Sequence, residues 1–103
     1  MIKFYDTSSL LLQPYTLDFD NPREIVGISS ITLEEIENIK ISNNKDADVK
    51  FAAARLSELL DEYYGKYYVE IYKEEYAKPI LKQGITITND TKIIACAINL
   101  NKL

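Results

Sequence analysis

The chain has 103 residues, of which 47% are hydrophobic and 27% charged, which suits one folded domain with one core. Its 16 acidic and 12 basic residues give a net charge of −4, so the chain as a whole does not attract nucleic acid. It contains no histidine and a single cysteine, Cys96, which excludes histidine-dependent catalysis, His-ligated zinc and an intramolecular disulfide.

The apolar runs of the sequence bear on its compartment. They are only a few residues long, too short to span a bilayer. Asp6 follows the first apolar run immediately, which argues against a signal peptide. Together with the single cysteine, these features predict a cytoplasmic protein.

The chain begins with a predicted strand and a short helix. Residues 2–5 form an apolar and aromatic run before a polar cluster, which predicts a buried strand. Residues 6–9 offer N-cap side chains, and residues 10–12 begin a helix. Residues 13–23 carry two prolines and several Asp and Asn residues, which predicts a loop.

A second strand and a second helix follow this loop. Residues 25–29 form a short apolar run with a polar end, typical of a strand. Thr32 and Glu35 have the spacing of a capping box, which predicts a helix that continues to about Ile41.

The longest helix is predicted over residues 47–63. One apolar stripe runs along it, made of Ala52, Leu56, Leu59, Leu60 and Tyr63. Gly65 marks the end of this helix. The alternation of residue types over residues 67–72 then predicts a third strand.

The last third of the chain is mostly helical in this interpretation. Residues 73–82 are polar and partly helical, with a break near Pro79, and residues 84–88 are extended or turn-like. Asn89 opens a final helix, whose apolar side we expect to contain Ile93, Ile94, Ala97 and Ile98. Strands that alternate with helices predict an α/β domain with a central parallel sheet.

The C-terminal end of the sequence has a consequence for the sheet. Leu103 lies at or just after the final helical pattern, where a β-α-β series would place another strand. We therefore expect a single domain over residues 1–103 that lacks its last strand. The open edge of its sheet could pair with another chain.

Three acidic residues occupy similar places in the predicted elements. Asp6 follows the first strand, Glu35 lies in the first turn of the next helix, and Asp90 lies at the start of the last helix. Each of them could simply cap a helix. Three carboxylates that meet in one cleft would instead need a cation to offset their repulsion, and oxygen ligands favour Mg²⁺ or Mn²⁺.

Three segments of the sequence resemble the motifs of PIN-domain nucleases. Residues 4–11 (FYDTSSLL) resemble the first motif, residues 28–36 (ISSITLEEI) the second, and residues 89–97 (NDTKIIACA) the third. The order and spacing of the motifs agree over nearly the whole chain. Residues 35–40 (EIENIK) are also similar to the PIN domain at the front of PhoH-like ATPases.

This resemblance implies a Rossmann-like, three-layer fold and a metal-dependent ribonuclease acting on single-stranded RNA. The acids of its metal site would be Asp6, Asp90 and Glu35, the last in preference to Glu34.

PIN domains usually carry a fourth acid in a Thr/Ser-x-Asp segment after the third-motif helix, and this chain ends before that point. Two interpretations therefore stay open: a nuclease that is weak or inactive in this form, and a degenerate domain that docks RNA or protein. A third interpretation, Asp6 as a phosphorylated nucleophile, lacks the second acid of an Asp-x-Asp motif.

Candidate substrate contacts are Thr7 and Ser8 beside the first acid, and Lys40 and Arg55 in the most basic window of the chain. A basic window of this kind is more often a solvated helix face. A group of tyrosines could stack on bases, although acidic neighbours favour a protein interface or contacts between copies of the chain; it comprises Tyr63, Tyr64, Tyr67, Tyr68, Tyr72 and Tyr76. Cys96, in an apolar helix, is expected to be an inert core residue.

Overall fold

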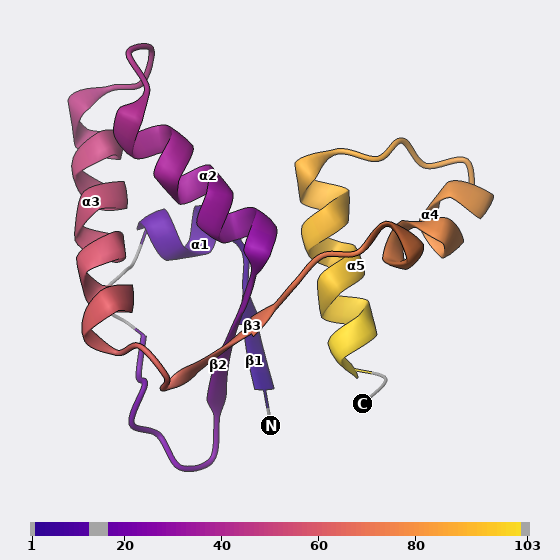
Figure 1. The fold of residues 1–103 in the computed structure, drawn as a ribbon, viewed down its shortest axis with the longest axis horizontal. Helices are drawn as coiled ribbons and strands as arrows, with labels where there is room; N and C mark the ends of the chain where they lie inside the picture. Colours follow the sequence, from indigo (N-terminus) through magenta and orange to yellow (C-terminus); the bar gives the residue numbers. More distant parts are fainter. Residues whose placement is uncertain (1, 13–16, 102–103) are drawn as a thin grey trace.

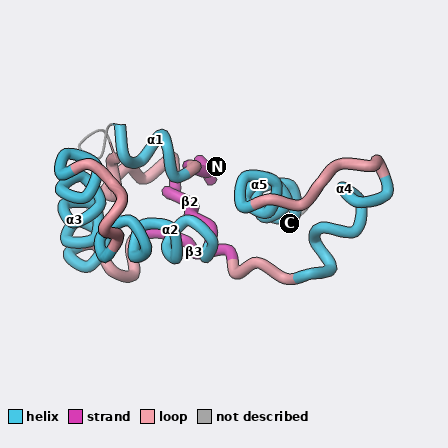
Figure 2. The backbone as a smooth tube through the Cα atoms, turned by 90° about the horizontal axis from the view of Figure 1, so that it is seen from above, coloured by secondary structure: helices cyan, strands magenta, loops and turns pink. Residues whose placement is uncertain are grey.

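Three short parallel strands form the centre of the computed structural model, which describes residues 2–12 and 17–101. The strands are β1 (Ile2–Tyr5), β2 (Ile25–Ser29) and β3 (Tyr67–Glu70), in the order β1-β2-β3. Helices cover both faces of this sheet, as Figures 1 and 2 show. The predicted α/β fold with a parallel sheet is confirmed. The part of the predicted loop at residues 13–16 lies outside the described residues.

The register of the strands brings their carboxyl ends to one edge of the sheet. Tyr5 lies opposite Ile28, and Ser29 lies opposite Glu70. In open α/β sheets this edge is where ligands bind. Asp6 follows β1 directly, so the first predicted acid is at this edge.

Three helices pack against one face of the sheet: α1 (Thr7–Leu12), α2 (Ser30–Ile41) and α3 (Ala47–Glu62). The core between them and β2 consists of Leu10, Val26, Ile28, Ile36, Ala53, Leu56 and Leu60. The predicted stripe of α3 is therefore confirmed at Leu56 and Leu60, whereas Ala53 rather than Ala52 is buried. Gly65, predicted to end this helix, has a φ of +90° in the turn before β3.

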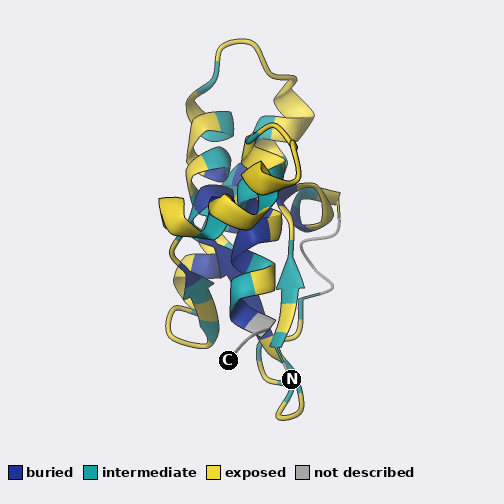
Figure 3. Cartoon of the chain, turned by 90° about the vertical axis from the view of Figure 1, so that its right-hand side faces the viewer, coloured by how far each residue is buried: buried dark blue, intermediate teal, exposed yellow. Residues whose placement is uncertain are grey.

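The opposite face of the sheet is covered by α5 (Asn89–Asn101), as Figure 2 shows. Its buried side contains Ile93, Cys96 and Leu100, while Ile94 and Ile98 are 53% and 48% exposed. The predicted apolar side was therefore wrong at Ile94 and Ile98. The sheet contacts a different side of the helix for two reasons. Gly27 in the central strand has no side chain, which leaves room for Leu100. Ser29 also donates a hydrogen bond to Cys96 Sγ at 3.4 Å. Figure 3 shows buried and exposed positions alternating around the helices.

The segment between β3 and α5 differs from its prediction in two places. The third strand ends at Glu70 rather than at residue 72, because the N–H of Tyr72 donates to Ser30 Oγ at 3.0 Å instead of to a strand. A 3₁₀ turn (Glu74–Ala77) leads into α4 (Lys78–Lys82). Pro79 lies in the first turn of α4, where a missing N–H costs nothing, so it begins the helix and does not break it.

The capping groups of two helices also differ from the prediction. Ser29 caps α2, since its side-chain oxygen accepts from the N–H of Ile31 at 3.1 Å. The helix therefore begins before Thr32, and the predicted capping box is wrong. At α5, the oxygen of Thr88 accepts from the N–H of Thr91 at 3.3 Å, so Thr88 and not Asp90 is the cap. Neither Glu35 nor Asp90 is used to cap its helix.

Candidate active site

Asp6 connects β1 to α1 and is exposed at the carboxyl edge of the sheet. Its Oδ1 accepts a hydrogen bond from the N–H of Ser9 at 2.8 Å, as an N-cap residue does. Hydrogen bonds from the Ser9 hydroxyl and N–H hold the pKa of Asp6 below its usual value. Because the pKa is lower in the folded chain, ionised Asp6 contributes stability above its ordinary pKa, and this contribution disappears as the pH falls through the folded value. At neutral pH the side chain is an anion.

Glu35 reaches the same region from the middle of α2. Its Oε1 accepts a hydrogen bond from Thr7 Oγ1 at 2.8 Å, and Thr7 is the residue after Asp6. Thr7 Oγ1 also lies 3.2 Å from the hydroxyl oxygen of Thr32, one turn earlier on α2. Thr7 and Thr32 are buried, so these contacts fix the position of Glu35 against the end of β1.

Asp90 lies in the first turn of α5 and is exposed. Its neighbour Asn89 and Glu35 both line one hollow of about 290 Å³. Asp6 and Ile93, one turn after Asp90, both line a second hollow, of about 360 Å³. The beginning of α5 is therefore close to both other acids, although the side chain of Asp90 lines neither hollow. In Figure 1, α1, α2 and the start of α5 all lie toward the upper end of the sheet.

The described residues contain no group of three or more Asp, Glu or Cys side chains close enough to hold one metal ion. The ligand chemistry nevertheless suits a hard cation, because each acid supplies carboxylate oxygens. The hydrogen bond that Glu35 accepts from Thr7 is on Oε1, so its second carboxylate oxygen is available to a cation. Mg²⁺ commonly uses one or two protein carboxylates and completes its coordination with water and phosphate. The joint role of Asp6, Glu35 and Asp90 stays a prediction.

The predicted substrate contacts have different surroundings. Ser8 is exposed on α1, whereas Thr7 is buried and donates to Glu35. Lys40 forms an ion pair with Glu37 at 3.2 Å, and Arg55 forms one with Glu58 at 2.9 Å. Both cations are therefore already paired on the surface, and their contact with substrate stays a prediction.

A fourth carboxylate at the sheet edge was missed as a candidate by sequence reasoning. Glu70 ends β3 and is only 5% exposed. Its Oε1 accepts from Tyr76 Oη at 3.1 Å and from Asn99 Nδ2 at 3.2 Å, while its Oε2 has no hydrogen-bond partner among the described residues. These bonds join the end of β3 to the 3₁₀ turn and to α5. The signal in the sequence is weak, because Glu70 lies inside the strand predicted over residues 67–72 and only the structure places it at the strand's end.

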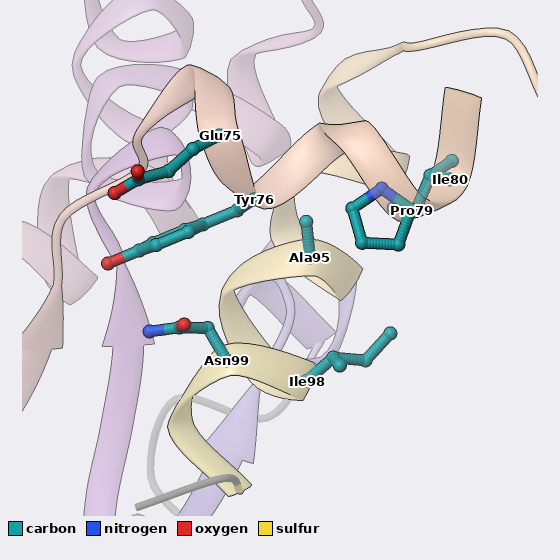
Figure 4. A pocket seen from close by; sticks show the side chains of 7 residues that line it. All are labelled: Glu75, Tyr76, Pro79, Ile80, Ala95, Ile98 and Asn99. Atoms are coloured by element: carbon teal, nitrogen blue, oxygen red, sulfur yellow. The ribbon is translucent and has the colours of Figure 1, made fainter. Parts of the chain in front are cut away.

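The tyrosines do not form one surface. Tyr63 and Tyr67 pack against Phe19, at centroid distances of 4.7 and 5.8 Å, while Tyr72 and Tyr76 contact each other at 6.4 Å. Tyr76 also lines a hollow of about 300 Å³ between the 3₁₀ turn, α4 and α5 (Figure 4). Asp6, Glu35 and Asp90 do not line that hollow, which separates it from the candidate site.

Cys96 is fully buried on the side of α5 that faces the sheet, as the sequence predicts. Burial raises the pKa of its thiol, which therefore stays protonated and unreactive at neutral pH. Within the described ranges, no helix is both long enough and apolar enough to cross a membrane.

The fold and the site together define a class: a small α/β domain with carboxylates at and near the carboxyl edge of a parallel sheet. The sequence profile of the family described as PIN domain matches residues 4–103. The chain therefore belongs to the PIN-domain family, whose members are in general metal-dependent nucleases, typically use divalent metals and commonly bind RNA. Neither the curated proteins nor the solved structures provide a match to the chain.

Proposed function

We propose that this chain is a divalent-metal-dependent ribonuclease that hydrolyses phosphodiester bonds of single-stranded RNA. Asp6, Glu35 and Asp90 would hold Mg²⁺ or Mn²⁺. Such an ion, when bound, activates water and neutralises the charge that develops on the phosphoryl group. We also propose that the chain functions as one PIN domain in the cytoplasm, the compartment that its single cysteine favours.

The observation that carries this proposal is the hydrogen bond between Thr7 and Glu35. It links the residue after Asp6 to an acid 28 positions later in the chain, at 2.8 Å. A helix that only needed capping would not require this contact, because Ser29 already caps α2. The position of Asn89 in the same hollow as Glu35 adds support from the third motif.

Each residue of the site has a specific role in the proposed reaction. Asp6 is anionic at neutral pH because Ser9 lowers its pKa, so it attracts a cation without first losing a proton. Thr7 holds Glu35 in one orientation, which leaves the second oxygen of Glu35 for binding. Asp90 adds a third negative charge from the exposed start of α5. A relation to the PIN domain of PhoH-like ATPases is part of the proposal and depends only on residues 35–40.

A second candidate function is a docking module for RNA or protein that does not catalyse. In the described part of the chain, β1 pairs only with β2, so the outer side of β1 is an open lateral edge of the sheet. The half-exposed Ile94 lines the hollow beside this edge together with Phe4. An open edge beside apolar side chains suits a protein partner or a second copy of the chain.

A cleavage assay on fluorescent single-stranded RNA distinguishes the two candidates. We expect the purified chain to shorten the RNA with Mn²⁺, to stop when EDTA is added, and to resume when excess Mn²⁺ is restored. Cleavage that continues in EDTA would contradict the proposal. Intact RNA at every Mn²⁺ concentration would also contradict it and would favour the docking module.

A further inference from the structure

The hollow beside Glu35 has a polar lining drawn from three parts of the fold. It measures about 290 Å³ and is lined by Glu35, Asn38, Ile39, Ser42, Lys45 and Asn89. Asn38 and Ile39 come from the last turns of α2, Ser42 and Lys45 from the connector to α3, and Asn89 from the start of α5. Residues distant in the sequence therefore converge next to one of the proposed metal-site acids.

Lys45 is the only cation among these lining residues, and it forms no ion pair with any described residue. This distinguishes it from Lys40 and Arg55, whose charges are paired with Glu37 and Glu58. The connector that carries Lys45 has a defined shape, because the N–H of Asn44 donates to Ser42 Oγ at 3.1 Å. Lys45 itself is exposed and lines the hollow, so its ammonium group is available to an anion.

The chemistry of the lining suits a phosphate of a nucleic-acid backbone. An ammonium group, two carboxamides and a hydroxyl are the side-chain groups that commonly contact phosphate and sugar. Glu35 repels phosphate from its own side, so an anion is directed toward Lys45. The net charge of −4 makes this unpaired cation more important, because the chain as a whole offers no attraction.

We infer that Lys45, assisted by Asn38 and Asn89, binds a backbone phosphate of single-stranded RNA next to the bond that is cleaved. This inference rests on the proposed function, since it assigns the substrate-binding side of the same site. It makes Lys45, rather than Lys40 or Arg55, the principal basic contact with RNA. Contacts with phosphate carry no sequence information, so the site would position RNA without selecting its bases.

The test measures RNA affinity in EDTA, where cleavage does not interfere. Fluorescence anisotropy with a labelled single-stranded RNA is recorded from low to moderate salt for the native chain and three variants. Lys45→Gln removes the proposed contact, and Lys45→Arg keeps its charge. Lys82→Gln, at the end of α4, makes the same change in net charge outside the hollow. Circular dichroism checks that all four chains are folded.

For Lys45→Gln we expect a dissociation constant raised about five- to ten-fold and a salt dependence of log K reduced by about 0.7, the value for one phosphate contact on a single strand. Lys45→Arg and Lys82→Gln should resemble the native chain. Equal behaviour of Lys45→Gln and Lys82→Gln would overturn the inference, as would the absence of RNA binding by the native chain at the lowest salt. If Lys45-dependent binding is found without Mn²⁺-dependent cleavage, the proposed hydrolysis fails while the phosphate contact stands.

Discussion

A chain carrying Asp6→Asn is expected to cleave RNA at least about 100-fold more slowly than the native chain, with little change in stability. The substitution removes the negative charge but keeps the side-chain oxygen that accepts from Ser9, and Asn caps helices about as well as Asp. The loss should therefore reflect the charge and not the fold. Rates of cleavage with saturating Mn²⁺, together with thermal melting, measure both effects.

Asp18→Asn is the matched control for this substitution. Asp18 is also exposed, and its Oδ1 accepts from the N–H of Asp20 at 3.1 Å in a similar local turn. It lines neither of the hollows that contain Asp6 or Glu35. We expect Asp18→Asn to cleave at the native rate within about two-fold. Equal activity of the two variants would remove Asp6 from the site.

The substitution Gly27→Val is expected to lower the free energy of unfolding by about 3 kcal/mol. Gly27 lies in the centre of β2 and faces α5. A Cβ at this position would lie 2.8 Å from Ile2 Cγ2, 3.2 Å from Phe4 Cδ2 and 3.6 Å from Leu100 Cδ2. Valine is a better strand residue than glycine, but that preference is worth only about 1 kcal/mol and does not offset the overlap. Urea denaturation measures the difference.

A graded pair of controls makes this prediction specific. Gly27→Ala adds only the Cβ, so we expect a smaller loss of about 1 kcal/mol. Ile25→Val changes the half-exposed first residue of the same strand and should lie within about 0.5 kcal/mol of the native chain. Native stability of Gly27→Val would contradict the close approach of Ile2 and Phe4 to Gly27.

The strands and most helices could be predicted from the sequence because their signals are local. Residues 2–5 and 25–29 are apolar runs with polar ends, and the strands occupy these same residues. The final helix was predicted at its correct first residue, but its buried side was not. Which side of an amphipathic helix meets a sheet depends on the surface of the sheet, and here that surface is shaped by the absence of a side chain at Gly27.

The contacts of the candidate site could not be predicted from the sequence, and the role of its residues stays a prediction. Asp6 and Glu35 were selected from residue type and spacing, yet their link through Thr7 joins segments 28 residues apart and leaves no local pattern. The spacing of Thr32 and Glu35 even suggested a different partner, because a capping box has the same sequence signature. Glu70 was missed for the same reason, since its partners Tyr76 and Asn99 meet it only in the folded chain.

Binding of Mn²⁺, followed by the electron paramagnetic resonance signal of the free ion, tests most directly whether Asp6, Glu35 and Asp90 serve one cation. We expect one saturable site, weakened at least about 10-fold by Glu35→Gln and by Asp90→Asn. Glu34→Gln, at the exposed neighbouring acid, should bind as the native chain does. If Asp90→Asn binds Mn²⁺ as tightly as the native chain, or if no saturable site exists, the three carboxylates do not form a common metal centre.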